Sequence, residues 1–113
     1  MSEAALIVQS DGTLLLDMHA DSNEEARAAI APFAELEKSP EHMHTYRMSP
    51  LSLWNAASAG YSGEVIIRAL TQHSRYAVPD SVTVNIHETL RNRNKIRVHI
   101  QHNIRAQFYM REV

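Results

Sequence analysis

Three ionisable residues lie close together near the middle of the chain, where Glu41 and His42 are followed, after one methionine, by His44. Two imidazoles two positions apart on a strand face the same side, and a neighbouring carboxylate adds an oxygen, so the pattern first suggests a metal site. Such a site needs a third or fourth ligand, and no HExxH or comparable spacing supplies one. We therefore predict no bound metal and expect the histidines to anchor the strand by hydrogen bonds.

Machinery for nucleotide hydrolysis or nucleophilic catalysis is not found either. A P-loop needs a glycine-rich turn followed by Lys and Ser or Thr, whereas Gly12, Gly60 and Gly63 are the only glycines and begin no such motif. The chain has no cysteine, so it offers no thiolate nucleophile. No Ser-His-Asp set can be recognised by spacing. The sequence predicts no catalytic residue, no cofactor and no small-molecule substrate.

Positive charge gathers in the C-terminal part of the chain. Residues 1–45 hold nine acidic and two basic residues, whereas residues 86–113 hold two acidic and six basic ones. The candidates for DNA contact are Arg91, Arg93, Lys95, Arg97, His99 and Arg105. Such cations would bind phosphates with an affinity that falls as salt rises. The alternative is a solvated, charged sheet face that protects an edge strand from aggregation.

Aromatic and aliphatic residues offer a second kind of candidate surface. The candidates for partner docking are Leu51, Trp54 and Tyr61. Large aromatic residues often act as the anchors of protein interfaces. Ordinary packing in the core is the alternative, and we favour it for the single tryptophan.

The first elements that must position these residues are a hairpin and a helix. Two apolar runs separated by Ser-Asp-Gly predict a β-hairpin over residues 5–17. Asp21 or Ser22 then caps a helix whose apolar positions continue to Leu36. Pro32 lies inside this pattern, where we expect a kink or a restart.

A strand that passes directly into a helix organises the middle of the chain. After Pro40, Glu41 and His42, residues 43–48 alternate in the manner of a strand. Ser49 offers a capping oxygen and Pro50 fills the first helical position, where no N–H is needed. Gly60 is suited to the left-handed conformation that ends a helix.

The second half is predicted to contain two further helices and a hairpin. Ser62 caps one helix, and another begins at Pro79 and ends at residues 92–94. Residues 95–110 alternate and predict an antiparallel hairpin with a basic outer face. The order β-β-α-β-α-α-α-β-β gives an α+β fold with helices packed on small antiparallel sheets, in one domain over residues 1–113. The second half has the element order of a winged helix.

The stretch from residue 40 to 47, PEHMHTYR, carries a resemblance that the later LWNA and YAVP stretches support. It resembles the N-terminal domain of the XPB family of DNA repair helicases, over about residues 6–109. The most specific positions, expected to be structural, are Pro40, Glu41, His42, His44 and Tyr46. The resemblance implies an ATP-driven 3′ to 5′ DNA translocase of nucleotide excision repair, whose N-terminal region engages DNA and contacts partner proteins.

The expected function combines this resemblance with the lack of a P-loop motif for nucleotide hydrolysis. The chain is predicted to be a non-catalytic accessory domain that positions DNA, docks against helicase motor domains or other repair proteins, or does both. The alternative is a free-standing winged-helix-like DNA-binding regulator or protein-interaction module. No apolar run approaches the roughly 20 residues that span a bilayer, and Met1-Ser2-Glu3 lacks the basic start of a secretory signal. We expect no membrane partner and a cytoplasmic location.

Overall fold

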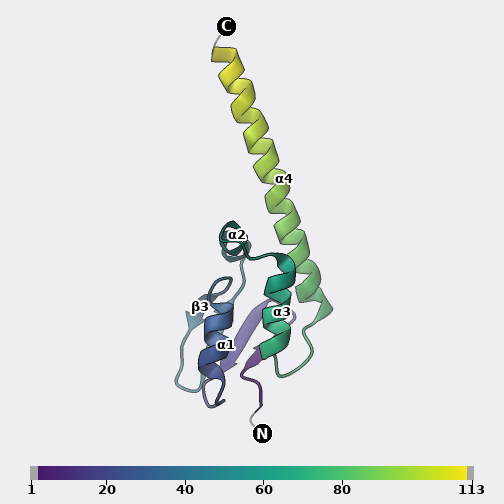
Figure 1. The fold of residues 1–113 in the computed structure, drawn as a ribbon. Helices are drawn as coiled ribbons and strands as arrows, with labels where there is room; N and C mark the ends of the chain where they lie inside the picture. Colours follow the sequence, from purple (N-terminus) through teal and green to yellow (C-terminus); the bar gives the residue numbers. More distant parts are fainter. Residues whose placement is uncertain (1–2, 112–113) are drawn as a thin grey trace.

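The computed structural model describes the backbone of residues 3–111 and the side chains of residues 3–95. It confirms the α+β class, with one antiparallel sheet and helices packed against it (Figure 1). The elements in chain order are β1 (Leu6–Val8), β2 (Thr13–Asp17), α1 (Asn23–Ile30), β3 (Glu35–Lys38), β4 (Met43–Arg47), α2 (Pro50–Ser58), α3 (Gly63–His73) and α4 (Asp80–Arg111).

The sheet has the strand order β1-β2-β4-β3, and all neighbouring strands are antiparallel. The predicted N-terminal hairpin is confirmed as β1 and β2. Its turn is closed by Gly12 at φ +89°, a conformation that glycine adopts without a steric cost. The Thr13 N–H donates to Asp11 Oδ1 over 2.9 Å. In the register of the sheet, Leu14 lies opposite Tyr46 and Leu16 opposite His44.

The first helix is shorter than predicted, because α1 ends at Ile30 and the residues up to Leu36 are not helical. Pro32 lacks the N–H that would continue the helix, and its ring would clash with the preceding turn. The N–H groups of Phe33 and Ala34 both donate to the Ile30 carbonyl, at 3.0 and 2.9 Å. The chain thus turns away and forms β3, an edge strand that the sequence reading missed. Leu36 lies opposite Tyr46 there and is 53% exposed.

The caps predicted for the next two helices are confirmed. Ser49 Oγ accepts the Ser52 N–H at 3.0 Å, and Ser52 Oγ accepts the Ser49 N–H at 2.8 Å, which makes a reciprocal capping box. Gly60 follows α2 with φ +100°. Ser62 Oγ accepts the Val65 N–H at 3.3 Å at the start of α3. Of the two caps proposed for α1, Ser22 holds the position, but its side chain makes no capping hydrogen bond.

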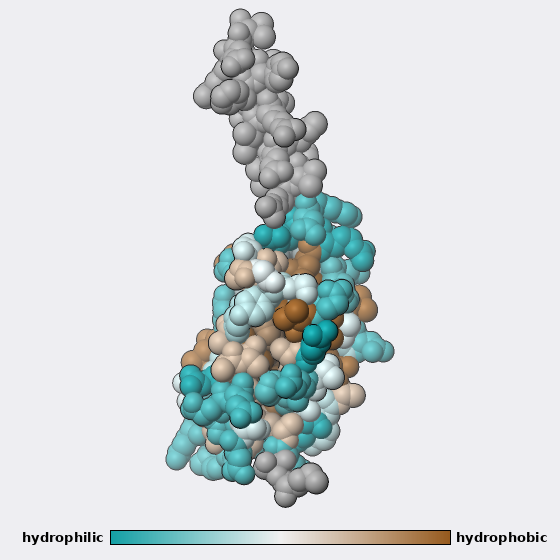
Figure 2. All heavy atoms as spheres, in the orientation of Figure 1, coloured by the Kyte–Doolittle hydropathy of each residue, from teal (hydrophilic) through white to brown (hydrophobic). Residues whose placement is uncertain are grey.

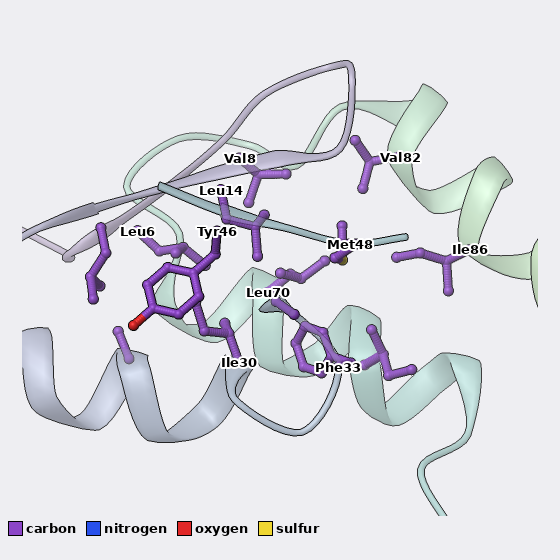
Figure 3. Packing of buried hydrophobic residues seen from close by; sticks show 14 of the residues in the cluster. Leu6, Val8, Leu14, Ile30, Phe33, Tyr46, Met48, Leu70, Val82 and Ile86 are labelled. Carbon is purple, nitrogen blue, oxygen red and sulfur yellow. The ribbon is translucent and has the colours of Figure 1, made fainter. Parts of the chain in front are cut away.

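The core lies between one face of the sheet and the helices. Figure 3 shows strand residues such as Leu14 and Tyr46 pointing toward Ile30, Phe33 and Leu70. Val82 and Ile86 of α4 join the same cluster, so the root of α4 is part of the core.

The predicted C-terminal hairpin, and with it the winged-helix order, is wrong. The helix that begins at Asp80 does not end at residues 92–94 but continues to Arg111 as α4, which projects away from the sheet (Figure 1). No glycine or proline interrupts residues 80–111. The alternation of Ile96, Val98 and Ile100 competes with a helical period of four, since apolar residues also stand at 96, 100, 104 and 108. Among the described helices, none combines the length and apolar character that a membrane span requires.

Candidate nucleic-acid interface

The N-terminal part of α4, from which the basic segment continues, is packed firmly against the rest of the fold. The Trp54 indole N–H donates to the Thr89 carbonyl over 3.0 Å, and the Arg93 guanidinium donates to Ser58 Oγ over 2.9 Å. Both hydrogen bonds join α4 to α2. Together with the burial of Ile86, they fix the direction in which α4 leaves the rest of the fold.

Arg91, Arg93 and Lys95 are the candidate DNA contacts with described side chains, and α4 divides them between two directions. Arg91 and Lys95 are exposed and lie four positions apart, so they share one helix face. Arg93 is partly buried and turns toward α2. The expected hairpin would have placed alternate residues on one face, whereas alternate residues of a helix point about 200° apart. Figure 2 shows hydrophilic residues gathered where α4 leaves the body.

Arg97, His99 and Arg105 also belong to α4, but their side chains lie outside the described residues. The sequence nevertheless gives the charge of this segment. Residues 89–111 contain six basic residues and no acidic one. A helix of this composition creates a positive potential that attracts polyanions.

The three docking candidates have different environments. Leu51 is 60% exposed on α2. Trp54 is partly buried and uses its N–H inside the fold, and Tyr61 packs against the hydrophobic core. They do not form one exposed aromatic anchor.

The motif residues lie along β4 and the turn that precedes it. Pro40, Glu41 and His42 are exposed, whereas Tyr46 is buried in the core. The rings of His42 and His19 stack with centroids 4.7 Å apart, and His42 Nδ1 lies 2.6 Å from His19 Nε2. His44 Nδ1 is buried without a hydrogen-bond partner.

Carboxylates lie near both histidines of the pair. Asp17 Oδ1 accepts the backbone N–H of His19 at 2.9 Å. Glu41 Oε2 lies 3.8 Å from His42 Nε2, the ring nitrogen that faces away from His19. Within the described residues, no group of three or more potential ligands is positioned to hold a metal ion.

An ion-pair cluster around Arg75 was missed by the sequence reading. Arg75 donates to Asp17 Oδ2 at 2.8 Å and to the Ala4 carbonyl at 2.9 Å, and Glu3 lies 3.3 Å away. The hydrogen bond from Arg75 is the main cause that lowers the pKa of Asp17, and the same bond raises the pKa of Arg75. This cluster ties the α3–α4 loop to the β1–β2 hairpin. No local spacing signals a pair 58 positions apart.

Known proteins similar to this chain are DNA helicases. Residues 6–111 match the model of the family described as the helicase conserved C-terminal domain. The chain belongs to this family. A DNA 3′-5′ helicase XPB from Mycobacterium tuberculosis is 54% identical over 90 residues, which are 80% of this chain and 16% of that protein. One from Kineococcus radiotolerans is 52% identical over the same length and shares.

More distant relatives are eukaryotic. The general transcription and DNA repair factor IIH helicase/translocase subunit XPB of Antonospora locustae is 29% identical over 97 residues, or 86% of this chain and 14% of that subunit. The chain thus spans about one sixth of the length of its more similar relatives. These matches confirm the resemblance to XPB helicases. The family description, however, names a C-terminal helicase domain, whereas the resemblance had implied an N-terminal one.

Proposed function

We propose that the chain is an accessory part of an XPB-like DNA helicase that holds DNA by its phosphates while other parts of the enzyme supply the motor. The observation that carries this proposal is the continuous helix α4, which presents Arg91 and Lys95 on one exposed face and contains no acidic residue from 89 to 111. The lack of any P-loop sequence is consistent with a non-catalytic role.

A phosphate-binding role fits the chemistry of the exposed cations. Arg91 and Lys95 are long, solvated side chains, and neither donates to another described residue in a hydrogen bond or ion pair. Contacts of this kind bind the DNA backbone without reading its sequence. An accessory domain that serves a translocating enzyme needs this property, because the enzyme meets every sequence in turn.

Fluorescence anisotropy with labelled duplex, forked and single-stranded DNA tests the proposal across a salt series. The variant Arg91→Glu/Lys95→Glu reverses two charges on α4. The matched control Lys38→Glu/Arg68→Glu makes the same change in net charge at two exposed residues on β3 and α3. We expect the α4 variant to lose at least about tenfold in affinity, and its log–log salt slope to fall by about two for duplex DNA.

The control distinguishes DNA binding by the local surface of α4 from attraction by the net charge of the whole chain. If both double variants weaken binding equally, the interaction follows overall charge and α4 is not the interface. If the unmodified chain binds no DNA at low salt, DNA contact by this part of the helicase is refuted.

The position in the parent protein is also part of the proposal. We place this segment before the motor domains, as the resemblance implies, and we propose a cytoplasmic location. Limited proteolysis of the intact relative from M. tuberculosis, followed by sequencing of the fragment that contains the matching segment, tests the order. A fragment bearing the N-terminus of the relative is expected. A fragment that reaches its C-terminus would contradict the placement and agree with the family description.

Docking against other parts of the helicase is a second candidate function, favoured by the outer face of the sheet. Ile7, Leu15 and Thr45 lie in register on neighbouring strands and are half-buried. They point away from the core residues Leu14 and Tyr46, because neighbouring residues in a strand face opposite sides. The apolar side chains of Ile7 and Leu15 on this face suit a moderately stable contact within one polypeptide.

A binding experiment with separately produced motor domains of the parent helicase tests the docking role. Leu15→Lys is expected to weaken association at 0.5 M salt, while Leu51→Lys, on α2, leaves it unchanged. Loss of association in the second variant alone would move the contact to α2. No association of the unmodified chain at any salt concentration would refute docking.

A further inference from the structure

Among the hollows on the described surface that an arginine lines, two differ in how the charge of that arginine is satisfied. The first, of about 230 Å³, is lined by Arg75 together with Glu3, Asp17 and Asp21. Two of these carboxylates pair with the guanidinium, at 2.8 and 3.3 Å. The arginine is therefore neutralised within the fold, and the surrounding negative charge opposes the entry of an anion.

The second hollow, of about 340 Å³, lies between the α2–α3 turn and α4. We call it the Arg93 hollow. Its polar side chains come from Tyr61, Ser62, Arg93 and Asn94. None of the described residues that line it is acidic. The guanidinium of Arg93 donates to the hydroxyl of Ser58 and takes part in none of the ion pairs of residues 3–95.

The contact with Ser58 positions the charge without neutralising it. A guanidinium carries five N–H donors in a planar fork, and the serine accepts from one of its terminal nitrogens. The remaining donors match the spacing of two phosphate oxygens, which is why arginine binds phosphate in a bidentate manner. Because Arg93 is already held against α2, less side-chain entropy is lost when it binds.

The amide of Asn94 adds neutral hydrogen-bond donors to the charged donors of the Arg93 guanidinium. It lies next to Arg93 in the sequence and lines the same hollow. Its NH₂ group provides two neutral donors. A charged fork and a neutral amide in a concave site without carboxylates form a typical oxyanion environment.

We propose that the Arg93 hollow binds a single phosphate group. This inference rests on the proposed function, because the expected source is a backbone phosphate of the DNA held along α4. Free phosphate or a phosphorylated metabolite has the same chemistry and is the other source. Arg93 would then fix the position of the DNA strand, while Arg91 and Lys95, which flank it in the sequence, add diffuse attraction from the exposed face of α4.

The first experiment uses inorganic phosphate as the probe and does not depend on DNA. Phosphate is titrated into the ¹⁵N-labelled chain, and chloride at equal ionic strength serves as the reference. We expect saturable shifts of the Arg93 Nε–H signal and of the Gly60 and Gly63 amides, and their loss in Arg93→Gln. Equal shifts in chloride, or shifts that do not saturate, would overturn the proposal.

The second experiment measures single-stranded DNA binding with a matched pair of variants. Asn94→Asp places a carboxylate in the hollow, whereas Asn92→Asp adds the same charge on α4 at a residue that does not line it. We expect Asn94→Asp to weaken binding about tenfold and Asn92→Asp about twofold, because only the first opposes a phosphate directly. This pair leaves the Arg93 side chain intact, so the test survives if Arg93→Gln does not fold.

The two experiments separate the inference from the proposed function. Saturable phosphate shifts without DNA binding would keep the hollow as a site for free phosphate and refute the DNA role. DNA binding that Asn94→Asp and Asn92→Asp weaken equally, without saturable phosphate shifts, would refute the hollow and keep the DNA role.

Discussion

The ion pair between Arg75 and Asp17 makes a quantitative prediction about stability and pH. Their side chains are 16% and 21% exposed, and the guanidinium nitrogen lies 2.8 Å from the carboxylate oxygen. A hydrogen bond to a charged group contributes about 1.5–3 kcal/mol, and partial exposure places this pair at the lower end. Asp17→Asn should lower the free energy of unfolding at pH 7 by about 1.5 kcal/mol, or the melting temperature by about 5–10 °C.

The lowered pKa of Asp17 also predicts how the effect of Asp17→Asn on stability changes with pH. Arg75 lowers the pKa of Asp17 in the folded protein below the ordinary value. The charged carboxylate therefore stabilises the fold at pH values above the unfolded pKa of about 3.9, and this contribution is lost as pH falls through the lower, folded pKa. The difference between wild type and Asp17→Asn should be full at pH 7 and should shrink steadily below about pH 4.

Urea unfolding followed by circular dichroism, at pH 7 and at steps from pH 5 to pH 2.5, measures both quantities. Glu24→Gln serves as the control, because it removes an exposed carboxylate that lies 3.4 Å from Arg27 and should change the free energy of unfolding by less than about 0.5 kcal/mol. A difference for Asp17→Asn no larger than that of the control, or one that stays constant down to pH 2.5, would refute the reasoning.

Four further substitutions test the packing by thermal unfolding. Trp54→Phe keeps a ring but loses the hydrogen bond to Thr89, so the free energy of unfolding should fall by about 1 kcal/mol; an unchanged melting temperature would contradict this. Gly60→Ala should cost about 1 kcal/mol through its φ of +100° alone, since no atom lies within 4 Å of the added Cβ. Leu36→Ala should cost less than about 0.5 kcal/mol and Phe33→Ala about 3–5 kcal/mol; the reverse order would restore Leu36 to the core.

Local signals in the sequence predicted those parts of the fold whose causes are local. The hairpin turn at Gly12 and the capping box at Ser49 each depend on side chains within a few residues. The strand β4 was predicted because His44 and Tyr46 alternate with residues of the other face. The sequence signals for these features lie within a few neighbouring residues.

Two elements were predicted wrongly, the end of the first helix and the C-terminal hairpin. The first depends on pairing with a strand that is distant in the sequence, and the second on whether apolar residues follow a strand period or a helix period. Leu36 fits a helical stripe, yet β3 forms because β4 offers a free edge to a chain already turned by Pro32. Its four residues are all exposed, so no pattern of burial could mark the strand. Residues 95–110 satisfy alternation and four-residue spacing together, and the helix already started at Asp80 continues through them.

The candidate interface was predicted in composition but not in geometry. The sequence placed the positive charge near the C-terminus, yet it could not show that Arg93 would turn toward Ser58 while Arg91 and Lys95 stay exposed. That division follows from the helical period and from the position of α2, 35 positions earlier in the chain. The Arg75 cluster and the Arg93 hollow were missed for the same reason.

Because the basic segment is helical, its binding to DNA should be coupled to the stability of α4. At 1.5 Å per residue, the 20 steps from Arg91 to Arg111 extend over about 30 Å, which is about one turn of duplex DNA. Like charges four positions apart, such as Arg91 and Lys95, repel each other and oppose the helix by a few tenths of a kcal/mol. Phosphates placed beside them remove this repulsion, so DNA binding and the stability of α4 should increase together. DNA binding without any gain in the helical circular dichroism signal or in melting temperature would contradict this coupling.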